Sequence, residues 1–362
     1  MLYLDANATE PLRPAAREAA VAAMAAGNPS SIHTAGREAR KILESAREAV
    51  ARFCAARPAD VIFTSGATEA NALALHALGK GRNILIGATE HDSIRAAVPH
   101  AITLPVRPDG TLAPETLEEA LAAHPGALVC LMAANNETGV LHDIEFTAKI
   151  CAAQGALLHI DAVQSVSRAR RDWLGMGASS FVLSGHKFGG PMGAGALIIR
   201  QGIEIEALTK GGGQEQGRRG GTPPLPAIAG LAAALGESYE ADKIATYRDE
   251  IEAFCVSLGA IAVGCKTPRL PNTTNLALPG VRAETQLIAL DMAGIAVSAG
   301  SACSSGKLAP SHVLTAMGCG DLAGQAIRVS LPWNVAQDSV EKFTTAYAAM
   351  VKRALRKPEH SA

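Results

Sequence analysis

The stretch FVLSGHKFGGPMG (181–193) passes from an apolar run to Ser184, then to His186 and Lys187, and ends in glycines and a proline. An apolar run that stops at turn residues is typical of a buried strand. Open α/β sheets bind ligands at the carboxyl ends of their strands, which is where Lys187 stands. Taken alone, however, the stretch favours a plainer interpretation: a strand followed by a glycine turn that carries a solvated lysine. The rest of the chain has to decide between the two.

Short apolar runs recur on both sides of this stretch and are separated by helix-like segments. Their hydrophobicity is continuous rather than alternating, which favours strands covered on both faces in a parallel α/β sheet. Residues 36–56 carry apolar side chains at helical spacing with charges opposite, which predicts an amphipathic helix. After about residue 245 the pattern changes, and we expect a second, smaller domain there. The predicted strands are VIFT (61–64), NILIGA (83–88), ALVCLMA (127–133), ALLHIDA (156–162), FVLS (181–184) and GALIIR (195–200).

The composition favours a protein that acts on small molecules. The 362 residues carry a net charge of -1, so neither a nucleic-acid surface nor an acidic tail is indicated. The longest apolar stretches, such as 126–134, fall well short of the ~20 residues that span a bilayer. The first residues show no export signal. The seven cysteines have no regular spacing and no Cys-x-x-Cys pair, so we expect a reducing cytoplasm and no metal site.

Polar residues at two further strand ends indicate what could bind. Gly66, Ala67 and Thr68 follow VIFT and open the next helix, where free N–H groups and the helix dipole suit a phosphate. Asp161 ends the run ALLHI, and a buried carboxylate is costly unless a cation meets it. A protonated ring nitrogen would meet that need, and pyridoxal phosphate sites place an acidic residue in this role beside a Schiff-base lysine.

At this point nine blocks, in this order, resemble the pyridoxal-phosphate-dependent cysteine desulfurases of the class V aminotransferase superfamily, of the iron–sulfur-assembly type. The resemblance implies an α/β fold-type I transferase. Its large domain, residues 14–245, would hold a mainly parallel seven-stranded sheet. A smaller α+β domain, residues 1–13 and 246–362, would carry a mobile cysteine loop. The blocks are YLDANAT (3–9), GNPSSIHTAGREAR (27–40), FTSGATEAN (63–71), TEHDS (89–93), NNETG (135–139), HIDAVQS (159–165), SGHKFGGPMGAGAL (184–197), GGGQEQGRRGGT (211–222) and SAGSACSSG (298–306).

The resemblance also implies a role for each site residue. Lys187 would hold pyridoxal 5′-phosphate covalently and move the proton at the substrate Cα. His91 would stack on the cofactor ring and assist that transfer, although a helix-capping or core histidine is an equal alternative. Arg328 would grip the α-carboxylate of L-cysteine, and Asn7 is a weaker substrate candidate. The implied cofactor contacts are Ala67, Thr68, Ser184 and His186 at the phosphate, Asp161 at the ring nitrogen, Gln164 and Asn135 at the phenolic oxygen, Asn135 also near the substrate, and Thr222 at the phosphate of a second subunit in a homodimer.

Sulfur chemistry is expected at Cys303. Its neighbours in SAGSACSSG are small and polar, which favours an exposed, mobile loop. By the resemblance, Cys303 would take the substrate sulfur as a persulfide, leaving alanine, and pass it to a sulfur-acceptor protein. That acceptor would be an iron–sulfur scaffold or a molybdenum-cofactor sulfuration partner. The other six cysteines are interpreted as structural.

Several positions depart from the family pattern, and they leave other functions open. We expect these positions near the entrance or the dimer face, where they would affect substrate fit and partner choice. RARRD (168–172) is interpreted as a solvated basic patch. The alternatives are another pyridoxal-phosphate enzyme of the same fold, namely an aminotransferase or a selenocysteine or cysteine lyase, and a non-catalytic sulfur-relay platform. The departures are Ala6, Glu10, Gln216, Pro223 with Pro224, Pro332 and Trp333.

Overall fold

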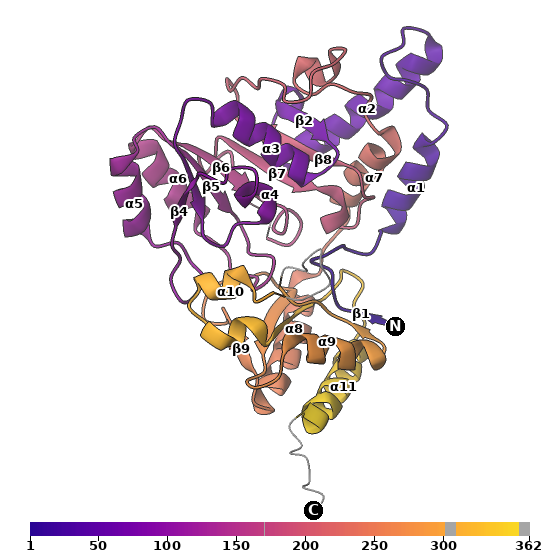
Figure 1. Ribbon diagram of the computed structural model, residues 1–362. Coiled ribbons are helices and arrows are strands. Elements are labelled where there is room, and N and C mark those ends of the chain that lie inside the picture. Colours follow the sequence, from indigo (N-terminus) through magenta and orange to yellow (C-terminus); the bar gives the residue numbers. More distant parts are fainter. Residues whose placement is uncertain (170, 301–308, 355–362) are drawn as a thin grey trace, which may run out of the picture.

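The computed structural model describes residues 1–169, 171–300 and 309–354, and its largest element is a seven-stranded sheet (Figure 1). The strand order is β2-β8-β7-β6-β5-β3-β4. Only β8 in this sheet runs antiparallel to its neighbours, so the expected mainly parallel sheet is confirmed. The strands are β2 (Val61–Thr64), β3 (Ile84–Gly87), β4 (Ile102–Leu104), β5 (Leu128–Met132), β6 (Leu157–Asp161), β7 (Ser180–Ser184) and β8 (Gly195–Ile199).

Helices cover both faces of this sheet, which explains why its strands are apolar throughout. In β5, Val129 and Leu131 contact one helical layer, whereas Leu128 and Cys130 contact the other. One layer consists of α1 (Pro14–Ala23), α2 (Thr34–Phe53), α5 (Pro114–Ala123), α6 (Ile144–Ala153) and α7 (Leu225–Leu235), and the other of α3 (Ala67–Leu78) and α4 (Asp92–Arg95). The predicted amphipathic helix is therefore confirmed as α2, which begins two residues earlier than expected and ends three residues earlier.

A second body packs below the sheet around its own core. Its antiparallel sheet has the order β12-β10-β9, and a short parallel pair joins β1 to β11. Leu4 from the start of the chain lies in this core with Phe343 and Tyr347. We therefore propose 1–13 with 246–362 as the small domain and 14–245 as the large one, a boundary that falls within the helix 241–257. The elements are β1 (Leu2–Tyr3), α8 (Ala241–Ser257), β9 (Ile261–Val263), β10 (Thr273–Ala277), α9 (Ala283–Met292), β11 (Ile295–Ala296), α10 (His312–Ala316), β12 (Ala326–Ser330) and α11 (Asp338–Ala354).

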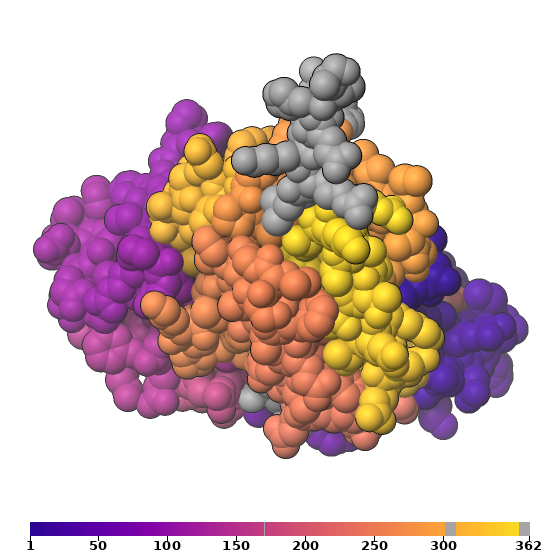
Figure 2. All heavy atoms as spheres, turned by 90° about the horizontal axis from the view of Figure 1, so that it is seen from below, coloured from indigo at the N-terminus to yellow at the C-terminus, as the bar shows by residue number. Residues whose placement is uncertain are grey.

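Seen from below, the second body, coloured orange to yellow, forms the middle of the molecule, with purple and indigo segments of the first body on either side (Figure 2).

Short 3-10 helices connect several elements. In the described ranges, no helix combines the length and the apolar character that crossing a membrane requires. The 3-10 helices are η1 (Pro58–Asp60), η2 (Gly185–Lys187), η3 (Gln214–Gly217) and η4 (Gly320–Gly324).

Two glycines that follow Lys187 in the block 184–197 are required by close approach. A Cβ on Gly195 would lie 2.7 Å from the Cα of Gly66, so β8 can run beside the turn that opens α3 only without a side chain. Gly189 has φ +89°, and a Cβ there would lie 2.5 Å from the Cγ of Arg13. These glycines let the α3 turn and the N-terminal segment close around the strand end that carries Lys187.

Candidate active site

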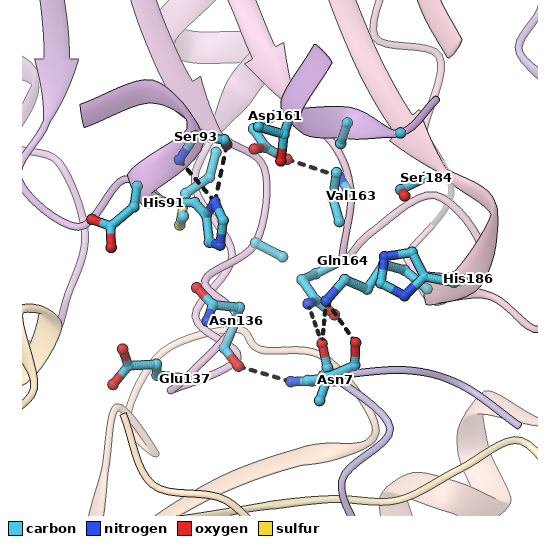
Figure 3. Close-up of a pocket in the computed structure, with 18 of the residues that line it drawn as sticks. Asn7, His91, Ser93, Asn136, Glu137, Asp161, Val163, Gln164, Ser184 and His186 are labelled. Atoms are coloured by element: carbon cyan, nitrogen blue, oxygen red, sulfur yellow. Dashed lines mark hydrogen bonds between the residues drawn. The ribbon is translucent and has the colours of Figure 1, made fainter. Parts of the chain in front are cut away.

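A cavity of about 610 Å³ lies at the carboxyl ends of the central strands, where the N-terminal segment crosses them. In the close-up, Asp161 lies at one end, His91 and His186 face each other across the space, and Asn7 and Asn136 close the other end (Figure 3). The cavity brings together most of the residues that the sequence predicted. Among its lining residues are Asn7, Ala67, Thr68, His91, Asp161, Gln164, Ser184, His186, Lys187 and Arg328.

Lys187 ends the 3-10 helix η2, directly after β7. Its Nζ donates to the carbonyl oxygens of Asn7 at 2.7 Å and Ala8 at 3.0 Å. Burial lowers the pKa of Lys187 to about 8, and the cations of Arg328 and Arg168 add to this effect. Lys187 is therefore not a solvated lysine, and a part of it carries a neutral amine near physiological pH.

The lowered pKa of Lys187 can be measured directly. We expect an amine-acylating reagent, applied to the cofactor-free protein, to reach half of its maximal rate at Lys187 near pH 8. An exposed lysine would reach half of its maximal rate at about pH 10.4. The midpoint for Lys187 lies at lower pH because burial and nearby cations disfavour the ammonium form. The reactive neutral amine therefore forms at lower pH than on an exposed lysine. Peptide mass spectrometry over a pH series checks this, with exposed lysines as internal references.

Arg328→Met should raise the midpoint for Lys187, because it removes a neighbouring positive charge. A wild-type midpoint close to that of the exposed lysines would contradict this description of the site.

The end of the cavity at the start of α3 has the character of an anion site. Ala67 and Thr68 begin the helix, and a Cβ on Gly66 would lie only 3.7 Å from the Oγ of Ser184. The Nδ1 of His186 lies 3.2 Å from the Oγ1 of Thr9. Burial, with the cation of Lys187, lowers the pKa of His186 to about 4, so its ring is neutral at pH 7. These backbone and side-chain donors can hold a phosphate.

Thr222 does not reach this cavity in the chain as described. It is exposed, at the end of the segment 211–222. Arg219 in the same segment pairs with Glu69 of α3 at 2.7 Å, and Glu69 lines the cavity. The segment is thus tied to the phosphate end of the cavity, with Thr222 facing outward.

The carboxylate of Asp161 lies at the end of a series of buried hydrogen bonds, which was not predicted from the sequence. Its Oδ2 accepts from Asn71 at 2.9 Å, and the Oδ1 of Asn71 lies 3.0 Å from the Nε2 of His159. The Nδ1 of His159 lies 2.8 Å from the Oγ of Ser180. Burial lowers the pKa of His159 to about 3, so its neutral ring fixes Asn71, which in turn orients the carboxylate. Asn71 and His159 lie inside the quoted blocks 63–71 and 159–165, which was the available signal.

His91 caps a helix and also lines the cavity, and its stacking on a cofactor ring stays a prediction. Its Nδ1 accepts from the backbone N–H of Ser93 at 3.1 Å and thereby caps α4. The same side chain is exposed and lines the cavity. Capping holds the ring at the cavity wall, opposite His186 (Figure 3).

Asn135 and Asn136 are neighbours in sequence but have different places at the site. Asn135 is buried, and its Oδ1 accepts from the backbone N–H groups of Glu137 and Thr138, both at 2.9 Å. Asn135 therefore shapes the turn behind the wall. Asn136 lines the cavity, and its carbonyl oxygen accepts from the Nδ2 of Asn7 at 2.9 Å.

Arg328 enters the cavity from β12 of the small body. Its Nη2 forms an ion pair with the Oδ1 of Asp5 at 2.6 Å, and its Nη1 donates to the carbonyl oxygen of Asn136 at 3.2 Å. The backbone of Arg328 also exchanges hydrogen bonds with Ser298, which is another lining residue. Asp5 was not among the sequence candidates, although it lies in the quoted block 3–9. It holds the guanidinium at the cavity wall.

Two sequence interpretations are wrong. Arg168 is not part of a solvated patch, because its side chain is 1% exposed and pairs with Glu10 at 2.7 Å. Glu10 and Ala6, expected near the entrance or the dimer face, are buried instead. Pro223 and Pro332 are also buried, whereas Gln216 is exposed and takes a positive φ of 59°. Apolar periodicity could not reveal the burial of Arg168, because a charged run ordinarily indicates solvent.

Cys303 lies outside the described residues. The described chain on both sides of it, Gly300 and His312, lines the cavity. None of the six described cysteines lines this cavity. Burial raises the pKa of four of them, to about 12 for Cys151, and so disfavours their thiolates. These four are Cys130, Cys151, Cys255 and Cys319.

The residues present fit pyridoxal phosphate. The anion site at the start of α3, the carboxylate of Asp161 and the amine of Lys187 line one cavity, and they match a phosphate, a protonated ring nitrogen and a carbonyl carbon respectively. The described ranges contain no group of three or more His, Cys, Asp or Glu side chains that could hold a metal ion.

Comparison with known proteins gives concordant matches. The family model described as aminotransferase class-V matches residues 2–343. An IscS-like cysteine desulfurase of Mycobacterium tuberculosis is 35% identical, over 98% of each chain. The crystal structure of a NifS-like protein from Rickettsia africae superimposes with a TM-score of 0.90 at 34% identity, covering 97% of this chain and 99% of that one. A structure titled SspA in complex with cysteine gives a TM-score of 0.82 at 28% identity, covering 93% and 100%.

Proposed function

The chain belongs to the class-V aminotransferase family and is a cysteine desulfurase, and on this premise we propose that Lys187, His91 and Cys303 carry its reaction. Enzymes of this family depend on pyridoxal phosphate. One observation carries the proposal: Lys187, Asp161 and Arg328 line a single cavity, and so does the described chain on both sides of the segment that holds Cys303. This arrangement supports a role for the Cys303 thiol at the same cavity.

Each residue of the chain has a separate task in the proposal. Bound at Lys187, the cofactor supplies an electron sink for the substrate Cα. Lys187, whose pKa is lowered to about 8 by burial, takes the proton from that carbon. Asp161, oriented by Asn71, keeps the ring nitrogen protonated. Gln164 donates to the phenolic oxygen, and His91 assists the proton transfer from the opposite wall.

Sulfur transfer uses Cys303 as its nucleophile. The Cys303 thiolate attacks the Sγ of the bound cysteine, so that an S–S bond forms and the substrate Cβ–Sγ bond breaks. The electron pair goes to the substrate and a proton is added at Cβ, which leaves alanine and a persulfide on Cys303. The raised pKa values of four other cysteines support this assignment, because thiols are poor nucleophiles when protonated.

The experiment that tests this function is incubation of the purified enzyme with L-cysteine. Alanine should appear, and the intact protein should gain the mass of one sulfur atom at Cys303. An amino-group transfer to an oxo acid without a mass gain would identify an aminotransferase instead. Selenocysteine, supplied in parallel, compares the two chalcogens.

Arg328 is proposed to bind the substrate α-carboxylate. Arg328→Ala should weaken substrate binding by about 2 to 4 kcal/mol, because it removes a charge-assisted contact from a buried site. The concentration dependence of alanine formation checks this. Arg328→Ala also leaves Asp5 unpaired, so Arg328→Ala with Asp5→Asn is the matched control for the loss of that ion pair. An unchanged dependence on cysteine concentration in both variants would contradict the assignment.

We also propose a cytoplasmic homodimer that delivers sulfur to an acceptor protein, either an iron–sulfur scaffold or a molybdenum-cofactor sulfuration partner. Exposed Thr222 supports the dimer, because the family uses this residue across the subunit interface. Val21, Met24 and Ile32, at the connection from α1 to α2, are between 57% and 88% exposed and are apolar, which favours their cover by a second copy. Light scattering of the purified enzyme measures the subunit number.

A further inference from the structure

A buried ion pair lies directly behind the cavity, and the reaction described above gives its arginine no role beyond the effect of its charge on Lys187. The Nη2 of Arg168 and the Oε2 of Glu10 are 2.7 Å apart, and each side chain is 1% exposed. The other oxygen of Glu10 accepts from the backbone N–H of Trp333, and Arg168 donates to the carbonyl oxygen of Ala6. Of the positions at which the chain departs from the family pattern, Ala6 and Glu10 contact this buried arginine directly, and Trp333 is linked to it through Glu10.

The same arginine contacts two residues that line the cavity. Its Nη1 donates to the Oε1 of Gln164 and, at 3.1 Å, to the Oδ1 of Asn7. A guanidinium has donors only, so the atom of each carboxamide that faces Arg168 must be the oxygen. The nitrogen of Gln164 then faces the other way and donates to the carbonyl oxygen of Asn7 at 3.0 Å. That carbonyl also accepts from Lys187.

We propose that Arg168 and Glu10 are positioning residues that set the orientation of the Gln164 carboxamide. Arg168 holds the oxygen of Gln164 at the back of the site, so that only N–H groups can face the cavity. Glu10 holds the guanidinium in place and balances its charge. The inference rests on the proposed role of Gln164 as a donor to the phenolic oxygen of the cofactor.

Charge and geometry make separable contributions here. Removing Glu10 alone leaves a buried, uncompensated cation, which is strongly destabilising. Removing both partners leaves no unpaired charge, yet it still frees Gln164 to turn. Lysine at position 168 keeps the charge but lacks the planar fork that contacts Glu10, Gln164 and Asn7 together.

The test compares holoenzymes that carry Arg168→Met, Arg168→Lys, Gln164→Ala, Arg168→Lys with Gln164→Ala, and Glu10→Thr with Arg168→Met. Arg269→Met is the matched control, because Arg269 pairs with Glu252 in the small body, where the two side chains are 8% and 14% exposed and do not line the cavity. For each protein, the dissociation constant of pyridoxal 5′-phosphate, the long-wavelength absorbance of the bound cofactor and the thermal unfolding midpoint are measured.

We expect Arg168→Met and Arg168→Lys each to raise the cofactor dissociation constant about tenfold or more and to shift its absorbance. Arg269→Met should lower the unfolding midpoint only. In the Gln164→Ala background, Arg168→Lys should add no further loss of affinity, because residues that act through one another are not additive. Glu10→Thr with Arg168→Met should recover thermal stability relative to Arg168→Met while its cofactor affinity stays low.

The inference would be overturned by an Arg168→Lys enzyme with wild-type affinity and absorbance, or by losses from Arg168→Lys and Gln164→Ala that add in full. Failure of the proposed function would look different from failure of this inference. In that case the wild-type enzyme would form no alanine or persulfide, while its cofactor affinity could still be measured. If Gln164→Ala itself leaves the affinity unchanged, the donor role of Gln164 fails and the inference with it.

Discussion

Lys187→Ala is expected to lose covalent cofactor attachment and turnover together. Among the described residues that line the cavity, Lys187 is the only lysine. Turnover should fall by about 10³-fold or more, because a nucleophile and a general base are lost at once. The Asp161 carboxylate and the start of α3 remain, so the variant should still bind the cofactor, but reversibly. Absorbance spectra before and after dialysis, with alanine formation, measure both effects.

Lys80→Ala is the matched control for that experiment. Lys80 is an exposed lysine that pairs with Glu206 on the surface and does not line the cavity. Its removal should change neither the absorbance nor the rate. Full activity in Lys187→Ala would refute the assignment of the catalytic lysine and of the site around it.

Cys303→Ser should separate cofactor chemistry from sulfur transfer. The variant keeps Lys187, Asp161 and the anion site, so it should bind the cofactor and respond spectrally to cysteine as the wild type does. It should not gain the mass of one sulfur atom, and alanine release should fall by orders of magnitude, because a serine hydroxyl is a far poorer nucleophile than a thiolate. Intact-mass measurement and alanine quantification after incubation with L-cysteine decide this.

The controls for Cys303→Ser are Cys265→Ser, at an exposed position, and Cys319→Ser, at a half-buried one. Both should retain the sulfur adduct and the rate. A stable adduct on Cys265 or Cys319 in the Cys303→Ser protein would assign the nucleophile elsewhere and leave the fold unaffected.

Local signals were sufficient for most of the main sheet. All six predicted strands are present, with ends within one residue of the expected bounds. They were recognisable because a continuous apolar run that ends at turn residues is typical of a short strand buried on both faces. The missed strand, β4, has three residues, of which only Leu104 is buried. An edge strand of this length has no hydrophobic run that could distinguish it from a loop.

The candidate site was predictable where a residue's role depends on its place at a strand end. Asp161, Ser184 and Lys187 follow from the position of their strands, and Thr68 follows from the start of a helix. Asp5, Asn71 and His159 were missed because they act through other side chains rather than through the cavity. Their place inside the quoted blocks marks them, but no local pattern of hydrophobicity or turn residues gives them a role.

By itself, the sequence determined six of the seven strands of the main sheet and the long amphipathic helix, and that Lys187 and Asp161 stand at strand ends. Only the tertiary structure decided that β8 runs antiparallel between β2 and β7, and that Arg168 is buried against Glu10 instead of solvated. The physical reason is the distance along the chain over which each kind of signal acts. Hydrophobic periodicity and turn residues act over a few positions, whereas the burial of a charge depends on partners far along the chain, here a carboxylate 158 positions away.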